Sequence, residues 1–271
     1  MCPQCRAFIT TDDKVCPYCN TQVGPRAIER RDPGEAIGGL IPQAHFTTVL
    51  ILLVNFGLYI ASAVYASQHG RGGFMDLDTT TLRLFGAKWN TAIMAGQWWR
   101  LITAGFLHGG IIHIGMNSWV LYDLGAQVEE AYGTARFLVI YFCAGVAGFA
   151  ASMWWSPSIS VGASASLLGL IGAMIALGTR SDSSHGRALR SFYVRWAVYG
   201  VALGFFMSAV DNAAHLGGLA AGFAVGYVAG TPRVMGTAET IWKGLAALSI
   251  LLTAYAFVQA GLFMLHYGGT V

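Results

Sequence analysis

The sequence predicts an all-α, multi-pass membrane protein, and three observations lead to this fold class. Of the 271 residues, 55% are hydrophobic and only 11% are charged, whereas a soluble domain carries about 25% charged residues. Apolar stretches recur between residues 46 and 265, several of them close to the roughly 20 residues that a membrane helix requires. Glycine is abundant, with 35 residues, and small residues let helices pack closely in lipid. The net charge of +3 is too small to indicate a nucleic-acid partner.

Seven apolar stretches are the predicted membrane helices. The segment between the first two stretches, residues 67–104, is polar and contains Trp89, Trp98 and Trp99, and such rings favour the membrane interface. We expect the seven helices at residues 46–66, 105–127, 135–155, 163–178, 192–209, 213–230 and 241–265.

The distribution of Lys and Arg predicts the orientation in the membrane. Loops on the cytosolic side carry an excess of these residues. With the N-terminus in the cytosol, twelve of the 16 Lys and Arg lie on the inner side. The other four, all in the segment 67–104, lie on the outer side. We therefore expect a multi-pass protein of a bacterial plasma membrane with its N-terminus in the cytosol. The outer four are Arg71, Arg83, Lys88 and Arg100.

Four cysteines near the N-terminus form two Cys-x2-Cys pairs, Cys2 with Cys5 and Cys16 with Cys19. Two such pairs are typical of a closed, structural zinc site with four thiolate ligands. A pair of disulfides is the alternative, but a cytosolic segment is kept reduced. The pattern predicts a zinc ribbon at 1–24, a linker at 25–45 and a membrane domain at 46–266. The role of the ribbon is open: it could bind a cytosolic partner, regulate the membrane domain or cap the terminus.

Polar side chains stand near the beginning of three predicted helices. His108, His113 and Asn117 belong to the second helix, Ser164 to the fourth and His215 to the sixth. In the predicted orientation all three helices run from outside to inside, so these side chains should share one depth. Polar groups inside a membrane helix are costly and are therefore functional candidates.

The helical faces suggest how Ser164 and His215 could meet. Gly218, Gly222 and Gly226 follow His215 on one face of the sixth helix, because their spacing matches the helical repeat. The fourth helix has a comparable face made of Gly169, Gly172, Ala173 and Ala176. If these faces pack together, His215 reaches the Ser164 hydroxyl, and a serine nucleophile needs such a base. Ser164 also opens its helix, where free N–H groups favour a developing oxyanion.

Three motifs in this order resemble those of the rhomboid intramembrane proteases. Further similarity lies in the pair Trp99-Arg100 and in the run from Glu129 to Phe137, and the resemblance covers residues 46–266. It implies a six-helix core plus one extra C-terminal membrane helix. The motifs are His-x4-His-x3-Asn (His108, His113, Asn117), Gly-x-Ser (Gly162, Ser164) and Ala-His-x-x-Gly (Ala214, His215, Gly218).

The resemblance also implies a role for each site residue. Ser164 would be the nucleophile and His215 the general base. His113 and Asn117 would form the oxyanion site together with the Ser164 N–H, and His108 would support the hydrogen bonds of the second helix. The substrates would be transmembrane segments of other proteins within the lipid bilayer, and catalysis would need no cofactor.

The sequence departs from the usual rhomboid pattern at two positions. Ala165 stands where the family usually has glycine. Leu168 stands where an aromatic ring usually stacks on the catalytic histidine. The second departure leaves open an inactive relative that binds membrane proteins as clients.

Other interpretations of the polar residues compete with the protease hypothesis. A transporter would predict inverted repeats and charged pairs in the helices, which the sequence lacks. Ser166 is a rival nucleophile, Asp211 a possible partner of His215, and the three histidines a possible metal site.

Overall fold

The computed structural model describes residues 2, 4, 5, 7, 15–21, 46–207, 210–232 and 237–268. The chain divides into two compact units, Met1–Phe46 and Thr47–Val271, and each is described by itself. The predicted linker at 25–45 lies outside the described residues.

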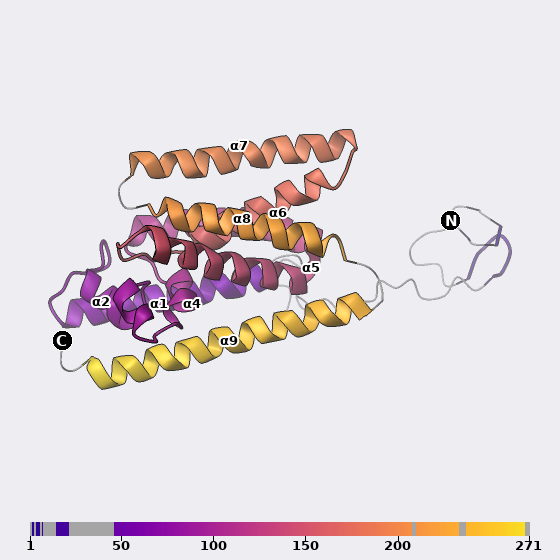
Figure 1. Cartoon of the computed structure of the whole chain (residues 1–271). Coiled ribbons are helices and arrows are strands. Elements are labelled where there is room, and N and C mark those ends of the chain that lie inside the picture. Colours follow the sequence, from indigo (N-terminus) through magenta and orange to yellow (C-terminus); the bar gives the residue numbers. More distant parts are fainter. Residues whose placement is uncertain are drawn as a thin grey trace. The chain divides into compact units, whose positions relative to one another are not determined.

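The larger unit consists of helices, and the described residues contain no β-strand beyond isolated bridges. This confirms the predicted all-α class. Four short elements, α2 to α4 and η3, connect α1 to α5 (Figure 1). The elements are α1 (Phe46–Gln68), α2 (Thr79–Phe85), α3 (Asn90–Met94), α4 (Arg100–Thr103), the 3-10 helix η3 (Ala104–Phe106), α5 (Ile111–Trp155), α6 (Ser164–Thr179), α7 (Ser184–Phe206), α8 (Asn212–Ala229) and α9 (Thr237–Tyr267).

Helix α5 contains two of the predicted membrane helices. Gly133 interrupts it with φ 74° and ψ 157°, a conformation that glycine adopts without steric cost. The predicted start of the second helix at residue 105 was wrong, because α5 begins only at Ile111. Residues before it form η3 and then an extended stretch in which Gly110 pairs with Asp76.

Three helices, α1, α5 and α9, are long and apolar enough to cross a membrane, and α6 is a shorter apolar helix. The 16 residues of α6 span about 24 Å, less than the roughly 30 Å of hydrocarbon in a bilayer. A helix of this length cannot reach from one surface of the hydrocarbon layer to the other.

Glycines bring α6 and α8 into backbone contact. A β-carbon on Gly222 would lie 2.0 Å from the Gly169 carbonyl oxygen, and one on Gly226 would lie 2.8 Å from Ala173. On the facing helix, a β-carbon on Gly172 would lie 2.3 Å from the Leu219 carbonyl oxygen. The two small faces recognised in the sequence therefore pack against each other.

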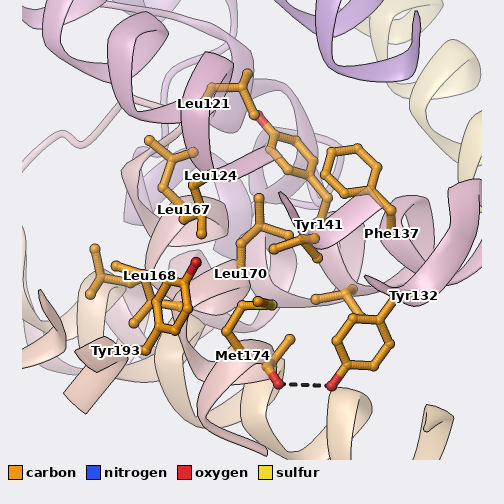
Figure 2. Packing of buried hydrophobic residues seen from close by; sticks show 14 of the residues in the cluster. Leu121, Leu124, Tyr132, Phe137, Tyr141, Leu167, Leu168, Leu170, Met174 and Tyr193 are labelled. Carbon is orange, nitrogen blue, oxygen red and sulfur yellow. Dashed lines mark hydrogen bonds between the residues drawn. The ribbon is translucent and has the colours of Figure 1, made fainter. Parts of the chain in front are cut away.

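A hydrophobic core packs mainly around α5 and α6 (Figure 2). Leu121 and Phe137 of α5 and Leu170 of α6 are fully buried in it. The buried Tyr132 hydroxyl donates a hydrogen bond of 2.7 Å to the Ala173 carbonyl (dashed line in Figure 2). In Figure 1, α7 and α9 lie on opposite sides of the central helices. Both carry exposed apolar side chains, which suit a lipid environment.

The segment between α1 and α5 is folded and contains two fully buried cations, Lys88 and Arg100. The Arg100 guanidinium donates to the carbonyls of Arg83 at 2.7 Å and Ala87 at 3.1 Å. It also stacks on Trp99, with its central carbon 4.6 Å from the ring centroid. A buried charge is tolerated only with such partners. The sequence analysis placed these two residues in a polar segment on the outer side, and the structure adds that both are buried.

The α6–α8 contact predicts a large difference between two glycine substitutions. Gly222→Ala should lower the melting temperature of the detergent-solubilised protein by roughly 2–10 °C, because the new methyl group forces two backbones apart. Gly261→Ala in α9 is the matched control, since a β-carbon there meets nothing within 4 Å. It should leave the melting temperature unchanged or raise it, because alanine favours the helix. Equal melting temperatures for both variants would contradict the close contact.

Candidate active site

Ser164 is the first residue of α6 and is partly exposed. It follows Gly162, whose φ of +126° lies in a region that favours glycine. The Gly162 N–H donates a hydrogen bond of 2.9 Å to the Ala104 carbonyl. The tight conformation at Gly162 thus directs the chain into α6, with the serine at the N-terminal end of the helix, where backbone N–H groups are free.

His113 lies against the turn that precedes Ser164. A β-carbon on Gly162 would lie 2.6 Å from His113 Nε2 and 3.7 Å from Ser164 Oγ. The side chains of His113 and Ser164 therefore both lie next to Gly162. The Gly109 N–H approaches His113 Nδ1 at 3.4 Å. If Nδ1 accepts this hydrogen bond, the neutral ring carries its proton on Nε2. Nε2–H is then a donor directed at the region beside the serine.

Asn117 lies one turn after His113 on α5 and is buried. Its Nδ2 donates to the His113 carbonyl at 2.9 Å, and its Oδ1 has no hydrogen-bond partner. Oδ1 can only accept, but Nδ2 has a second N–H beyond the one bonded to His113, and this hydrogen is available to a bound oxygen atom.

His215 lies in the first turns of α8 and is 7% exposed. A β-carbon on Gly218, one turn later, would lie 2.1 Å from the carbonyl oxygen of Ala165. Because Ala165 directly follows Ser164, this contact brings the turns that carry Ser164 and His215 side by side. His215 Nδ1 has no hydrogen-bond partner, and no hydrogen bond joins the two side chains in the described part of the chain. Catalytic hydrogen bonds are often long without substrate.

The other candidates occupy different places. His108 is buried with its ring 5.1 Å from that of His113, and neither of its nitrogens has a hydrogen-bond partner among the described residues. Ser166 is buried and donates to the Tyr141 carbonyl at 2.9 Å. Asp211 caps α8 by accepting the Ala214 N–H at 3.1 Å, and it also accepts the Ser152 hydroxyl. Neither of these hydrogen bonds involves His215 Nδ1.

Leu168 is buried where α6 faces α7. A β-carbon on Gly200 of α7 would lie 3.4 Å from a Leu168 methyl group. The Leu168 side chain therefore packs against Gly200 of the neighbouring helix α7.

The four N-terminal cysteines form a compact cluster in the smaller unit. All are free thiols, and their sulfur atoms lie within 4.8 Å of one another. Cys2 and Cys19 are 3.6 Å apart, as are Cys5 and Cys16. Four thiolates bound tetrahedrally at 2.3 Å from zinc would be separated by about 3.8 Å. The donor set and its spacing therefore fit a metal of this kind.

The two cysteine pairs also share one backbone pattern. The Cys2 N–H donates to the Ala7 carbonyl at 2.9 Å, and the Cys16 N–H donates to the Thr21 carbonyl at 2.9 Å. Each bond closes a turn over the same number of residues, so the pairs are two similar knuckles facing one cluster.

A family model described as the Rhomboid domain matches residues 95–232, just over half of the chain. The chain belongs to the rhomboid family. The match contains all of the residues that line the candidate site, from His108 to Gly218. Together with its long apolar helices, membership of this family makes the chain an integral membrane protein.

Curated rhomboids from distant organisms are similar to this chain. The rhomboid protease GluP of Bacillus subtilis (strain 168) is 36% identical over 185 residues, covering 68% of this chain and 36% of that protein. Rhomboid-like protease 2 of Toxoplasma gondii is 33% identical over 194 residues, covering 69% and 67%. The mitochondrial RHOMBOID-like protein 6 of Arabidopsis thaliana is 39% identical over 160 residues, covering 57% and 52%. The matches span between about a third and two thirds of the length of these relatives.

The geometry at Gly162 predicts that this rhomboid site does not tolerate a side chain there. Gly162→Ala should slow covalent labelling of the protein by a serine-directed fluorophosphonate about 100-fold, because it displaces His113 and strains the turn before Ser164. Gly115→Ala is the control, since a β-carbon at Gly115 meets nothing within 4 Å. Labelling of the Gly162 variant at the native rate would contradict the described turn.

Proposed function

We propose that this rhomboid is an intramembrane serine endopeptidase that uses Ser164 and His215 as a catalytic dyad. The observation that carries the proposal is the contact of Gly218 with the Ala165 carbonyl, which aligns the turns bearing the two residues. A second contact supports the proposal: a β-carbon on Gly162 would lie 2.6 Å from His113 Nε2 and 3.7 Å from Ser164 Oγ, so a donor is available near the serine.

The proposed reaction proceeds through an acyl-enzyme. Ser164 Oγ attacks the scissile carbonyl carbon while neutral His215 accepts the hydroxyl proton. The resulting imidazolium then protonates the leaving amine, the C–N bond breaks, and the acyl group remains as an ester on Ser164. A water molecule, deprotonated by His215, hydrolyses this ester and restores the serine. In this second step the His215 imidazolium returns the proton to Ser164 Oγ as the ester bond breaks. The proposed reaction therefore needs no metal or cofactor.

The negative oxygen of the tetrahedral intermediate needs hydrogen-bond donors in place before it forms. His113 Nε2–H, the Asn117 amide and the free Ser164 N–H at the start of α6 are the proposed donors. His113 is suited to this role because the Gly109 N–H at its Nδ1 favours the tautomer with a proton on Nε2.

The proposed substrates are transmembrane segments of other membrane proteins. A helical substrate shields its own carbonyl groups through internal hydrogen bonds. The scissile stretch must therefore become extended before Ser164 can reach a carbonyl, which favours substrates whose helices unwind easily.

We also propose that Cys2, Cys5, Cys16 and Cys19 hold one structural zinc ion in a ribbon at residues 1–24. Such a site is closed and does not take part in catalysis. A module this small has little core of its own, so metal binding would supply its folding free energy. The Lys and Arg distribution supports a cytosolic N-terminus, and residues 25–45 would link the ribbon to the protease domain at 46–266.

The dyad predicts that Ser164→Ala and His215→Ala each abolish cleavage of a model transmembrane substrate. Each variant loses the nucleophile or its base, while the helices around it keep their packing. The measurement is turnover in detergent together with fluorophosphonate labelling, with Ser166→Ala as the matched serine control. Substantial turnover by the Ser164 variant would sink the assignment. A native protein that neither cleaves nor labels would favour an inactive relative that binds membrane clients.

The zinc ribbon predicts that replacing Cys16 and Cys19 with Ser releases about one zinc ion per chain, because serine hydroxyls are poor zinc ligands at neutral pH. Residues 1–24 should then unfold, while cleavage of a short substrate in detergent should continue. Zinc content by atomic emission and turnover are measured on the same purified variant. Stoichiometric zinc after both substitutions would refute the site. Loss of all activity in a folded variant would show that the ribbon controls the protease.

A further inference from the structure

Lys88 is a fully buried cation that the proposed chemistry does not use. It lies between α2 and α3, and its Nζ donates to the carbonyls of Ser156 at 2.6 Å and Ser158 at 3.0 Å. Burying an ammonium group is costly unless it finds such acceptors. A fully buried lysine with two backbone partners therefore fixes the segment that supplies those carbonyls.

That segment, residues 156–163, leads directly to the nucleophile and is named here the serine strap. Its first residue, Ser156, caps the C-terminus of α5, where a positive charge is favourable. The Lys88 backbone adds a second attachment: its N–H donates to the Ser160 carbonyl at 3.0 Å, and the Ser160 N–H donates to the Lys88 carbonyl at 3.2 Å. One residue thus makes four hydrogen bonds to the strap that ends at Ser164.

Other residues of the segment between α1 and α5 hold both ends of the same strap. The Asn90 side chain donates to the carbonyls of Met153 at 2.9 Å and Ser156 at 3.0 Å. At the other end, the Ala104 carbonyl accepts the Gly162 N–H. The position of Ser164 is therefore set by the segment between α1 and α5, and Lys88 supplies the only cation among these attachments in the described residues.

Lys88 is also linked to the helix that carries the base. Burial lowers the pKa of the Lys88 ammonium, and the nearby carboxylate of Asp211 opposes this shift. Asp211 caps α8, accepts the His215 N–H on its backbone carbonyl at 3.0 Å, and bonds the Ser152 hydroxyl through its side chain. The Ser152 carbonyl in turn accepts the Ser156 N–H at 2.8 Å, and the Ser156 carbonyl accepts the Lys88 ammonium at 2.6 Å. Hydrogen bonds at the C-terminal end of α5 therefore link Lys88 to the end of α8 that fixes His215.

We propose that Lys88 is a positioning residue that holds Ser164 and His215 in register for the proposed hydrolysis, through the serine strap and through the end of α5 that binds Asp211. The inference rests on the proposed function. Lys88 touches neither catalytic side chain, so it acts through other residues. The reason it matters for rate is that a displacement of about 1 Å between reacting groups can cost about 100-fold.

The test compares Lys88→Met, which keeps the length of the side chain but removes its charge and donors, with the native protein. Turnover of a transmembrane substrate gives kcat and KM, and a fluorophosphonate gives the labelling rate of Ser164 per folded molecule. We expect kcat and the labelling rate to fall together by about 10- to 100-fold, with KM within about twofold of native. Lys88→Arg retains the charge and should recover part of both rates.

The control is Lys243→Met, which removes an exposed lysine of α9 and should leave all three quantities unchanged. A folded Lys88→Met protein with native kcat and labelling rate overturns the proposal. A lowered melting temperature with a native labelling rate per folded molecule also overturns it, because it would reveal a role in stability alone.

A second variant keeps the proposal falsifiable if Lys88→Met does not fold. Asp211→Asn removes the carboxylate that binds the Ser152 hydroxyl but retains a residue that caps helices well. It should lower kcat and the labelling rate several-fold, and native rates would overturn the link to α8. The native protein is measured in parallel: if its Ser164 does not label, the proposed function fails. If it labels and both variants match it, only the inference about Lys88 fails.

Discussion

The backbone contact between α6 and α8 is the interaction on which the rest of this structure depends. Helices in lipid gain little from the hydrophobic effect, so close van der Waals packing must hold them together. Gly169 and Gly222 make that approach possible, since each lacks the β-carbon that would separate the two backbones. The same contact fixes the chemistry, because Ser164 and His215 are borne by the turns at one end of this helix pair. The stability of the core and the alignment of the candidate dyad therefore both depend on the α6–α8 contact.

The candidate site also depends on a part of the chain that contributes no catalytic side chain. The segment between α1 and α5 binds the serine strap through Lys88 and Ala104 and pairs with Gly110 just before α5. It thereby fixes the loop before Ser164 and the start of the helix that carries His113. Buried cations are suited to this task, because each must satisfy several donors and so ties several carbonyl groups into one arrangement.

The N-terminal cysteine cluster requires a different source of stability from the membrane helices. Its knuckles, at Cys2 and Cys16, repeat one hydrogen-bond pattern, and in the described part of the smaller unit the buried cluster consists of cysteines. A metal would replace the core as the source of stability. The cluster belongs to a compact unit distinct from the one that carries Ser164, which is why ribbon and protease are proposed as separable modules.

The sequence by itself determined the all-α class, the family and the faces on which α6 and α8 meet, because these depend on local composition and helical spacing. It also identified Ser164, His215, His113 and Asn117 as one group, through motif order and expected depth. Only the tertiary structure decided how the segment between α1 and α5 folds and which of its charged side chains are buried. Lys88 and Arg100 resemble ordinary loop charges in the sequence, yet both are buried, because their acceptors come from carbonyls distant in the chain or hidden by folding. Likewise, the late start of α5 follows from pairing with Asp76, a contact between chain segments that no local pattern encodes.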